Sequence, residues 1–317
     1  MNLGQTLLIA RRRTEGDTAL VDLVAPDGAP LPAWQAGAHI DVGIGPDLIR
    51  QYSLCGDPAD RSRYRLGILR DPASRGGSVR AHELFQEGSS IRTGVPRNLF
   101  PLHIGQRETL LIGGGIGITP LLAMAHDLHR AGHAFRLHYC IRSRSRAAFL
   151  TELAALPFAD RVSIHADDGA ADQRFDPVRD LPAPEPGIEV HFCGPNGFMT
   201  WLEAQCLARR YSAPNLHQEH FSAEIDTSGG GFTVELAQSG LVLQVGESQT
   251  ILQTLRGAGI RVETMCQQGI CGTCLTGVLD GVPDHRDSFL TDEERAGNAL
   301  IAVCCSRSKT ERLVLDL

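Results

Sequence analysis

The first hundred residues alternate between apolar and polar side chains, in short runs separated by turn residues. Residues 6–16 and 18–28 read TLLIARRRTEG and TALVDLVAPDG, and their alternation predicts two strands joined as a β-hairpin. Similar runs, divided by glycine and proline, follow at residues 38–44, 50–56 and 64–70. Short strands at this spacing predict an antiparallel β-barrel over residues 1–104.

From residue 105 the pattern changes to apolar strands that alternate with helical segments. Four strand-like runs lie at residues 109–114, 135–142, 161–168 and 188–195. This order predicts a parallel α/β domain over residues 105–225. The carboxyl ends of parallel strands meet at one edge of the sheet, and ligands bind in the crevice there.

A third module follows a glycine-rich segment. Residues 226–232 contain TSGGG, and this composition predicts a flexible linker. Beyond it come two alternating strands, a turn and a helix, and then a loop rich in cysteine. This is the order expected of a small β-grasp ferredoxin domain over residues 233–317.

Composition narrows the class of protein. The chain has 317 residues, enough for two or three domains, and its net charge of −7 argues against nucleic acid as a partner. No apolar run approaches the roughly 20 residues that a membrane span requires, and the N-terminus lacks the pattern of a secretory signal. We therefore expect a cytoplasmic protein that does not contact membranes. Residues 233–317 carry 11 acidic and seven basic side chains, a surface that favours a basic partner.

Four cysteines near the C-terminus have the spacing of a metal centre. Cys266, Cys271 and Cys274 form a C-x4-C-x2-C motif, and Cys304 follows after 29 intervening residues. The plant-type [2Fe–2S] ferredoxin takes three thiolates from one loop and a fourth from a distant segment. Structural zinc is less favoured, because only one C-x2-C pair is present. Cys305 remains an alternative to Cys304 as the fourth ligand.

A glycine-rich turn follows the first strand of the α/β region. It reads Gly113, Gly114, Gly115, Ile116, Gly117, Ile118, Thr119 and Pro120. Such a turn lets a pyrophosphate approach bare backbone amides, with Thr119 predicted as the helix N-cap. Pro120 stands where the G-x-G-x-x-G fingerprint needs its third glycine, so an ordinary Rossmann dehydrogenase is disfavoured. The crevice should also receive the loops that carry Arg142, Ser143, Cys193, Gly194 and Pro195.

Two stretches of the barrel region carry polar groups suited to a ligand. The first is the run Arg50, Gln51, Tyr52, Ser53 and Leu54, in which positions 50 and 52 share one face and 51 and 53 the other. The second begins with Arg70 and Arg75 and continues through Gly76, Gly77, Ser78 and Val79. A short helix is predicted at residues 78–85 with Ser78 as its N-cap, and the start of a helix can bind phosphate.

Taken together, these motifs resemble the phthalate dioxygenase reductase family, which includes the vanillate O-demethylase reductases. RQYSL, RGGSVR, GGGIGITP, FCGPNGFM, EHFSAE, CQQGICGTC and AVCCSRS occur in the family's order along essentially the whole chain. The resemblance implies a Greek-key flavin-binding β-barrel, an α/β nucleotide-binding domain of the ferredoxin-reductase type and a C-terminal [2Fe–2S] ferredoxin domain. It also implies FMN as the flavin.

The resemblance assigns a role to individual residues. The flavin would be contacted by the run from Arg50 to Leu54, by Ile68, Leu69 and Arg70, and at its phosphate by Gly76, Gly77, Ser78 and Val79. The nicotinamide nucleotide would lie across the 113–120 turn. Catalytic contacts would come from Ser53, Thr119, Cys193 near the reacting carbon, and Phe221 packed against the flavin where nicotinamide enters. Cys266, Cys271, Cys274 and Cys304 would hold the cluster.

The activity implied is that of an oxygenase reductase. Hydride passes from NAD(P)H to FMN, and single electrons leave through the cluster to a terminal Rieske oxygenase or O-demethylase that acts on an aromatic acid. The resemblance implies NADH, yet the loop from Arg142 to Arg146 has no acidic residue for a ribose diol, and its arginines could bind the 2′-phosphate of NADPH. A monomer is expected. A stand-alone flavin or ferric reductase, a reductase serving another acceptor, and a pure electron carrier remain as alternatives.

Overall fold

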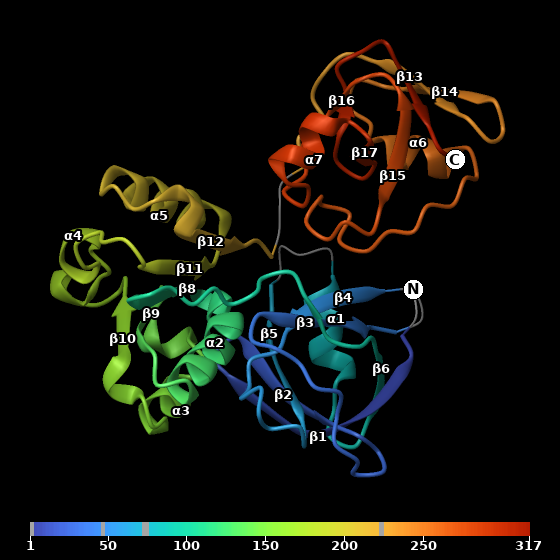
Figure 1. The fold of residues 1–317 in the computed structure, drawn as a ribbon. Coiled ribbons are helices and arrows are strands. Elements are labelled where there is room, and N and C mark those ends of the chain that lie inside the picture. The colour runs from blue at the N-terminus through green and yellow to red at the C-terminus, as the bar shows by residue number, and fades with distance from the viewer. Residues whose placement is uncertain (1–2, 46–47, 72–75, 222–224) are drawn as a thin grey trace. The chain divides into compact units, whose positions relative to one another are not determined.

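The computed structural model describes residues 3–45, 48–71, 76–221 and 225–317. The chain divides into two compact units, one of residues 2–221 and one that begins at residue 222 (Figure 1). Each unit has its own sheets and core and is described by itself. Within the described residues, no helix has both the length and the hydrophobicity that a membrane crossing requires.

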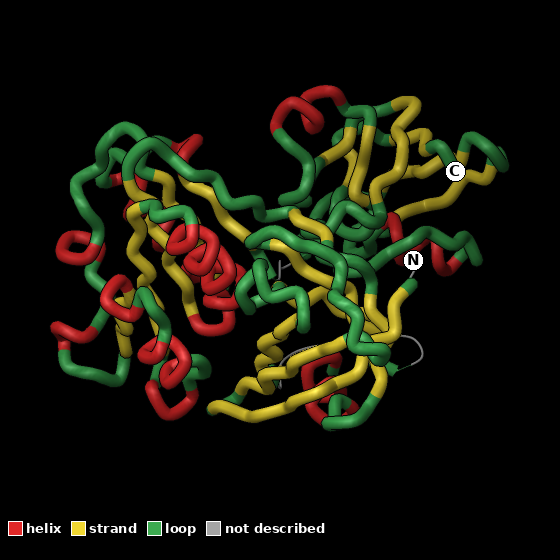
Figure 2. The backbone as a smooth tube through the Cα atoms, turned by 60° about the horizontal axis from the view of Figure 1, so that its bottom comes forward, coloured by secondary structure: helices red, strands yellow, loops and turns green. Residues whose placement is uncertain are grey.

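An antiparallel sheet of seven strands forms a barrel in the first unit (Figure 2). Six strands follow the order β4-β3-β6-β1-β2-β5, and β7 pairs with β3. A bridge between Leu54 and Leu66 joins the two ends of this order and closes the barrel. Side chains that point inward, such as Ile9 and Ile40, are fully buried. The strands are β1 (Gln5–Glu15), β2 (Thr18–Val24), β3 (Ala38–Gly43), β4 (Ile49–Ser53), β5 (Tyr64–Leu69), β6 (Ser90–Thr93) and β7 (Arg97–Asn98).

Helix α1 (Gly77–Leu84) packs against this barrel, and His82 Nε2 bonds the Ile68 carbonyl of β5 at 2.8 Å. The predicted helix is confirmed, but the prediction of Ser78 as its N-cap is wrong. Gly76 occupies the cap position with φ 81°, a left-handed backbone that glycine adopts without strain. Ser78 lies inside the helix, and its hydroxyl bonds the main chain of Asp71 instead.

The second sheet of this unit is parallel, in the order β10-β9-β8-β11-β12. Its strands are β8 (Glu108–Gly114), β9 (Ala134–Ile141), β10 (Val162–Ala166), β11 (Glu189–Cys193) and β12 (Leu216–Glu219). Helices lie between them in the chain: α2 (Ile118–Arg130), α3 (Leu150–Ala155), α4 (Pro177–Asp180) and α5 (Asn196–Ala208), besides short 3₁₀ turns such as η1 (Gly115–Gly117). Leu111 packs with the α2 side of the sheet, and Leu110 and Ile112 pack with α5. Both faces are therefore buried, as in other parallel sheets.

The predicted cap of α2 also differs from the structure. Helix α2 begins at Ile118 directly after η1, so Thr119 lies within its first turn rather than before it. The Thr119 hydroxyl donates a hydrogen bond to the Ile116 carbonyl at 2.8 Å. Gly132 follows the last residues of α2 with φ 67°.

The second unit has a five-stranded sheet in the order β14-β13-β19-β15-β17, in which β13 and β19 are parallel. Its strands are β13 (Phe232–Leu236), β14 (Leu241–Val245), β15 (Leu275–Asp280), β17 (Leu300–Ala302) and β19 (Arg312–Leu315), and β16 (Pro283–Asp284) pairs separately with β18 (Arg307–Ser308). Helix α6 (Ile251–Gly257) adds Ile251 and Leu255 to the core, and α7 (Asp292–Gly297) precedes β17. This is the β-grasp arrangement that the sequence predicts.

The segment expected to be a flexible linker is held by two arginines of the second unit. Arg286 Nη1 donates to the carbonyls of Asp226 and Ser228 at 2.7 and 2.8 Å. Arg307, which is 2% exposed, donates to the carbonyls of Gly229 and Gly230 at 3.4 and 2.9 Å. Residues 226–230 are thus bonded to the ferredoxin fold.

Candidate functional site

The three cysteines of the C-x4-C-x2-C motif lie in an irregular loop between α6 and β15, and Cys304 lies in the turn after β17. Their thiols form a continuous chain of contacts. The Cys266 thiol meets those of Cys271 and Cys304, and Cys304 also meets Cys274. Hydrogen bonds donated by the neighbouring thiols lower the pKa of Cys266 and of Cys274. Four sulfurs from two distant segments therefore converge.

The loop geometry fits a binuclear cluster. Gln267, Gly269 and Gly272 have positive φ values of 54°, 75° and 69°, so the backbone curls tightly around the thiols. The Gln268 amide donates to Cys266 Sγ at 3.3 Å, a bond of the kind that stabilises a thiolate. Among the described residues no group of three or more His, Cys, Asp or Glu surrounds a single ion position. A [2Fe–2S] cluster needs no such group, because each iron takes two protein thiolates.

Cys304 and Cys305 have different surroundings. Cys304 contacts two thiols of the loop, as described above. Cys305 Sγ lies 3.7 Å from the Ala302 carbonyl and 3.8 Å from Ser306 Oγ. It also lies beneath Gly269, where an added Cβ would come within 2.5 Å of it. Cys305 therefore supports the loop from below, although its thiol also touches Cys304.

The predicted flavin residues gather where β4, β5 and α1 meet. Arg50 lies against the start of α1, because a Cβ on Gly77 would come within 2.7 Å of Arg50 Nε. Arg50 and the first amides of α1, from Gly76 to Val79, thus share one location. Tyr52 is half-buried, and burial raises the pKa of its hydroxyl to about 12. Arg75, expected to add a donor here, lies outside the described residues.

The other residues predicted near the flavin have differing exposure. Ile68 is 1% exposed, Leu69 is half-buried and Arg70 is exposed. Gln51 Nε2 lies 3.1 Å from His39 Nε2 on the neighbouring strand. Leu54 is fully buried in the barrel core, so it can offer a ligand only its main chain.

The α/β sheet approaches β5 through the start of α2. A Cβ on Gly67 would come within 2.8 Å of Thr119 Cγ2 and 3.2 Å of Ile116 Cδ1. Gly67 precedes Ile68 and Leu69, two of the predicted flavin residues. Thr119 therefore reaches the barrel next to the expected flavin position, and the lack of a side chain at residue 67 permits this approach.

The glycine-rich turn packs against the end of β11. Cys193 pairs in register with Gly113 on one side and with Glu219 of β12 on the other. Gly117 lies directly on the Cys193 carbonyl, and Gly114 and Gly194 both pack on the ring of Phe198. Pro195 caps α5 next to them. The structure thus brings the 113–120 and 193–195 loops together, at the point where strand order reverses around β8.

Glu219 is a residue that sequence reasoning missed. Its Oε2 accepts a hydrogen bond from the Ser53 hydroxyl of the barrel at 3.4 Å. Burial raises the pKa of its carboxyl from 4.5 to about 8. Cys193 is fully buried beside it, and burial followed by the Glu219 charge raises the pKa of that thiol well above its usual value. Phe221 follows two residues later and is 37% exposed.

A second missed feature lies beside the Arg142 loop. The Asp167 amide donates to the Ile141 carbonyl at 2.9 Å, and the Asp168 amide donates to the Arg142 carbonyl at 3.2 Å. The loop itself has no acidic residue, but these two exposed aspartates at the end of β10 lie next to it. Within the loop, Ser143 Oγ accepts from the Ser145 amide and so caps a short 3₁₀ turn.

Comparisons with known proteins agree with this architecture. The family of 2Fe-2S iron-sulfur cluster binding domains matches residues 234–309. Vanillate O-demethylase oxidoreductase of Pseudomonas sp. (strain HR199 / DSM 7063) is 45% identical over 99% of both chains. Phthalate dioxygenase reductase of Burkholderia cepacia is 36% identical over 98% of this chain and 96% of its own. The chain belongs to the phthalate dioxygenase reductase family.

Solved structures extend the match to the fold. A structure of phthalate dioxygenase reductase covers 99% of this chain and 98% of its own, with a TM-score of 0.74 and 36% identity. An intact type IV self-sufficient cytochrome P450 monooxygenase matches 99% of this chain with 41% of its own, at a TM-score of 0.83 and 39% identity. The chain is thus an iron–sulfur oxidoreductase of the phthalate dioxygenase reductase family, with a flavin barrel, an α/β nucleotide domain and a [2Fe–2S] domain.

Proposed function

We propose that this chain is the NADH-dependent reductase component of an oxygenase system, with FMN in its barrel. The hydrogen bond between Ser53 and Glu219 is the observation that carries the proposal. It joins the predicted flavin strand β4 to the end of the α/β sheet, beside Cys193 and the glycine-rich turn. Residues suited to a flavin and residues suited to a nicotinamide nucleotide therefore surround one place.

FMN fits the barrel because the phosphate donors are local. Arg50 and the amides at the start of α1 together offer a guanidinium and a helix N-terminus, the donors that a terminal phosphate needs. When bound, a flavin accepts hydride and releases electrons singly, and the protein supplies orientation. Thr119 and Ser53 line its expected place, and the exposed ring of Phe221 can cover it until nicotinamide enters.

Asp167 and Asp168 support NADH over NADPH. Acidic side chains near the nucleotide site accept hydrogen bonds from a ribose diol and repel a 2′-phosphate. Arg142 and Arg144 would attract that phosphate, but the aspartates next to Arg142 offset their charge. We expect kcat/KM to favour NADH by at least about tenfold, and a steady-state comparison of the two nucleotides tests this.

The four converging thiols support Cys266, Cys271, Cys274 and Cys304 as the cluster ligands. Replacing Cys271 with Ser should abolish the visible absorbance of the cluster and the reduction of acceptors that depend on it. Reduction of flavin by NADH should survive, since the flavin residues lie in the other unit. In the unaltered protein, anaerobic titration with NADH should bleach flavin and cluster together. Loss of flavin reduction in folded C271S protein would refute this division of roles.

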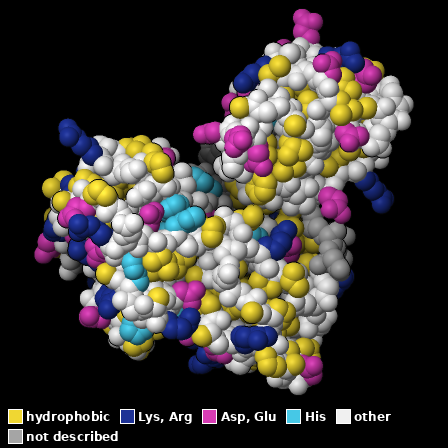
Figure 3. Space-filling view, viewed as in Figure 1, with side chains coloured by type: hydrophobic (Ala, Val, Ile, Leu, Met, Phe, Trp, Pro, Cys, Tyr) yellow, Lys and Arg dark blue, Asp and Glu magenta, His cyan; other side chains and the backbone are white. Residues whose placement is uncertain are grey.

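The acceptor we propose is a terminal Rieske oxygenase. Several relatives are named as reductase subunits of oxygenases, among them the carnitine monooxygenase reductase subunit of Escherichia coli, 39% identical over 93% of this chain. Acidic side chains (magenta) are spread over the visible face of the ferredoxin unit in Figure 3, which favours a basic docking partner. No disulfide joins any of the nine cysteines, all within the described residues, which fits the cytoplasmic location we propose, and we expect a monomer.

A haem monooxygenase is the second candidate acceptor. The match to a self-sufficient cytochrome P450 monooxygenase shows the same three-part architecture within a longer chain that carries that name. Purified reductase with NADH should support turnover when mixed with a Rieske oxygenase encoded near its gene. Activity only with a cytochrome P450 would favour this second candidate.

A further inference from the structure

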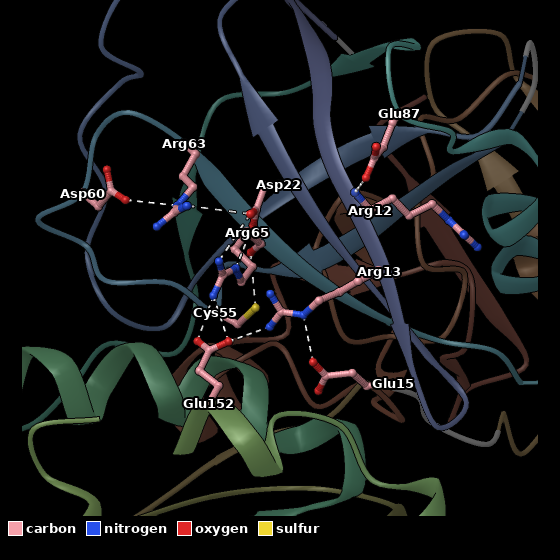
Figure 4. Close-up of polar contacts among 10 residues, drawn as sticks. All are labelled: Arg12, Arg13, Glu15, Asp22, Cys55, Asp60, Arg63, Arg65, Glu87 and Glu152. Atoms are coloured by element: carbon pink, nitrogen blue, oxygen red, sulfur yellow. Dashed lines mark hydrogen bonds and ion pairs between the residues drawn. The ribbon is translucent and has the colours of Figure 1, made fainter. Parts of the chain in front are cut away.

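A carboxylate of the α/β half binds two arginines of the barrel (Figure 4). Glu152 on α3 accepts from Arg65 Nη1 at 2.8 and 3.0 Å through its two oxygens. Its Oε2 also accepts from Arg13 Nη2 at 2.8 Å. The side chains of Arg65 and Glu152 are 12% and 19% exposed, so the contact is largely shielded from solvent.

The two arginines are themselves held in place by barrel carboxylates (Figure 4). Arg65 forms a two-point contact with Asp22 of β2, at 2.7 Å from Nε and 3.3 Å from Nη2. Arg13 Nε donates to Glu15 Oε1 at 2.8 Å. Glu15 Oε2 then accepts from the Phe149 amide at 2.7 Å, just before α3 begins. Glu152, Arg65, Arg13, Asp22 and Glu15 form what we call the Glu152 network.

The network acts on the strand that borders the expected flavin position. Arg65 lies on β5, two residues before Gly67. Gly67 contacts Thr119 and Ile116 at the start of α2, and the tip of the Phe149 ring, where an added Cβ would lie 3.2 Å from Phe149 Cζ. The ion pairs and these contacts therefore fix the α/β half against the same short strand. Ile68 and Leu69 follow directly along it.

We propose that Glu152 is a positioning residue for hydride transfer. By binding Arg65 and Arg13, it holds α3 and the start of α2 against β5, and so fixes the distance at which nicotinamide meets flavin. This inference rests on the proposed function. Transfer between bound groups depends steeply on placement, and an error of about 1 Å can cost on the order of a hundredfold in rate. Binding of the nucleotide depends much less on this placement.

The test compares Glu152→Gln with the unaltered protein by anaerobic stopped-flow mixing with NADH. The amide keeps the shape of the side chain and removes the charge that binds two guanidinium groups. We expect the limiting rate of flavin reduction to fall about tenfold or more, the apparent Kd for NADH to change less than about twofold, and the long-wavelength charge-transfer absorbance to weaken. In flavin-free protein, amide hydrogen exchange over residues 147–155 should quicken.

Two further variants sharpen the result. Arg13→Gln removes one of the two ion pairs of Glu152 and keeps the contact between Arg65 and Asp22. Its rate of flavin reduction should therefore lie between those of the unaltered protein and E152Q. This variant tests the proposal if E152Q does not fold. Glu235→Gln is the matched control, since it breaks an ion pair with Arg312 at 3.0 Å in the ferredoxin unit, and its rate should be unchanged. A wild-type rate and absorbance in folded E152Q and R13Q would overturn the proposal. Failure of NADH to reduce the unaltered protein would instead refute the proposed function.

Discussion

Glu219 and Cys193 share the end of the α/β sheet, in register on adjacent strands. Burial favours the neutral form of both the carboxyl and the thiol, because it removes the water that would stabilise their charged forms. The Ser53 hydroxyl is the polar partner that the carboxyl retains. Glu219 is therefore protonated near neutral pH because of its position at the end of β12, and its carboxyl titrates at about pH 8.

Glu219 should make hydride transfer depend on pH. Its carboxyl pKa is raised to about 8, so the group is neutral below that pH and negative above it. A negative charge beside the nicotinamide site stabilises the positive charge that develops as hydride leaves. We expect the rate of flavin reduction to rise through about pH 8, and Glu219→Gln to remove that step in a stopped-flow pH profile. A step that persists in E219Q would assign the titration to another group.

The same shift has a consequence for stability. A group whose pKa is raised on folding stabilises the fold most below its unfolded pKa of 4.5, and this contribution is lost as pH rises through about 8. The free energy of unfolding of the flavin-free protein should thus decline over that range more steeply than in E219Q. Chemical denaturation at several pH values measures the difference, and parallel curves would contradict it.

The adjacent cysteines Cys304 and Cys305 give a direct comparison. Only Cys304 contacts the loop thiols Cys266 and Cys274. We expect Cys304→Ser to lose most of the cluster absorbance. Cys305→Ser should keep the cluster, because its sulfur packs beneath Gly269 and bonds the nearby main chain. The visible spectrum and the iron content of the two variants distinguish these outcomes. Loss of the cluster in C305S but not in C304S would make Cys305 the ligand.

Strand β5 contacts several different elements of the first unit. It pairs with β2, closes the barrel against Leu54, accepts a bond from His82 of α1 and receives the start of α2 at Gly67. Glycine is usually unfavourable inside a strand. Here it is needed because another element approaches too closely for a side chain.

Replacing Gly67 with Ala should therefore separate β5 from α2. The new methyl group would meet Thr119 Cγ2 at 2.8 Å, and overpacking of this kind costs about 1–3 kcal/mol. We expect a lower melting temperature and slower flavin reduction by NADH. Adding Thr119→Ser removes the clashing methyl group and keeps the hydroxyl that bonds Ile116, so the double variant should recover part of both. No recovery would show that the clash with Thr119 is not the cause.

Elements were easier to predict than their ends. Hydrophobic periodicity placed the first five barrel strands within a few residues, because it reflects which face is buried, but it did not mark the short strands β6 and β7. It did not reveal that Gly76 and Gly117 precede helices α1 and α2. The hydroxyls of Ser78 and Thr119, the residues predicted as caps, bond the main chain of Asp71 and Ile116 instead. The short strand β12 also escaped prediction.

For the molecule as a whole, the order of the three modules could be read from sequence, because the motifs that mark each module are local. The side-chain contacts between distant segments could not be predicted from sequence. Ser53 and Glu219 are 166 residues apart, and Arg65 and Glu152 are 87 apart, so no local pattern marks either pair. The predicted boundary at residues 104 and 105 falls between two sheets of one compact unit.

The first unit should work without the second. Residues 2–221 form one compact unit that has its own two sheets and its own core. We expect a chain ending at Phe221 to fold, bind flavin and be reduced by NADH, while losing electron transfer to acceptors that need the cluster. Flavin content and anaerobic bleaching test this. A fragment that does not fold would show that the ferredoxin unit is needed for the first unit's stability.

Arg286 and Arg307 also shorten the free chain that precedes the ferredoxin fold. An extended chain spans about 3.3–3.6 Å per residue, so the five residues from Asp226 to Gly230 would add roughly 17 Å of reach if they were free. The carbonyls of four of these residues are bonded to Arg286 and Arg307 instead, so the segment does not extend freely. In general, a shorter free segment between two joined modules raises the effective concentration of one at the other, as long as it still spans their sites. Two guanidinium groups thereby fix how much length this segment can add to the spacing between the modules.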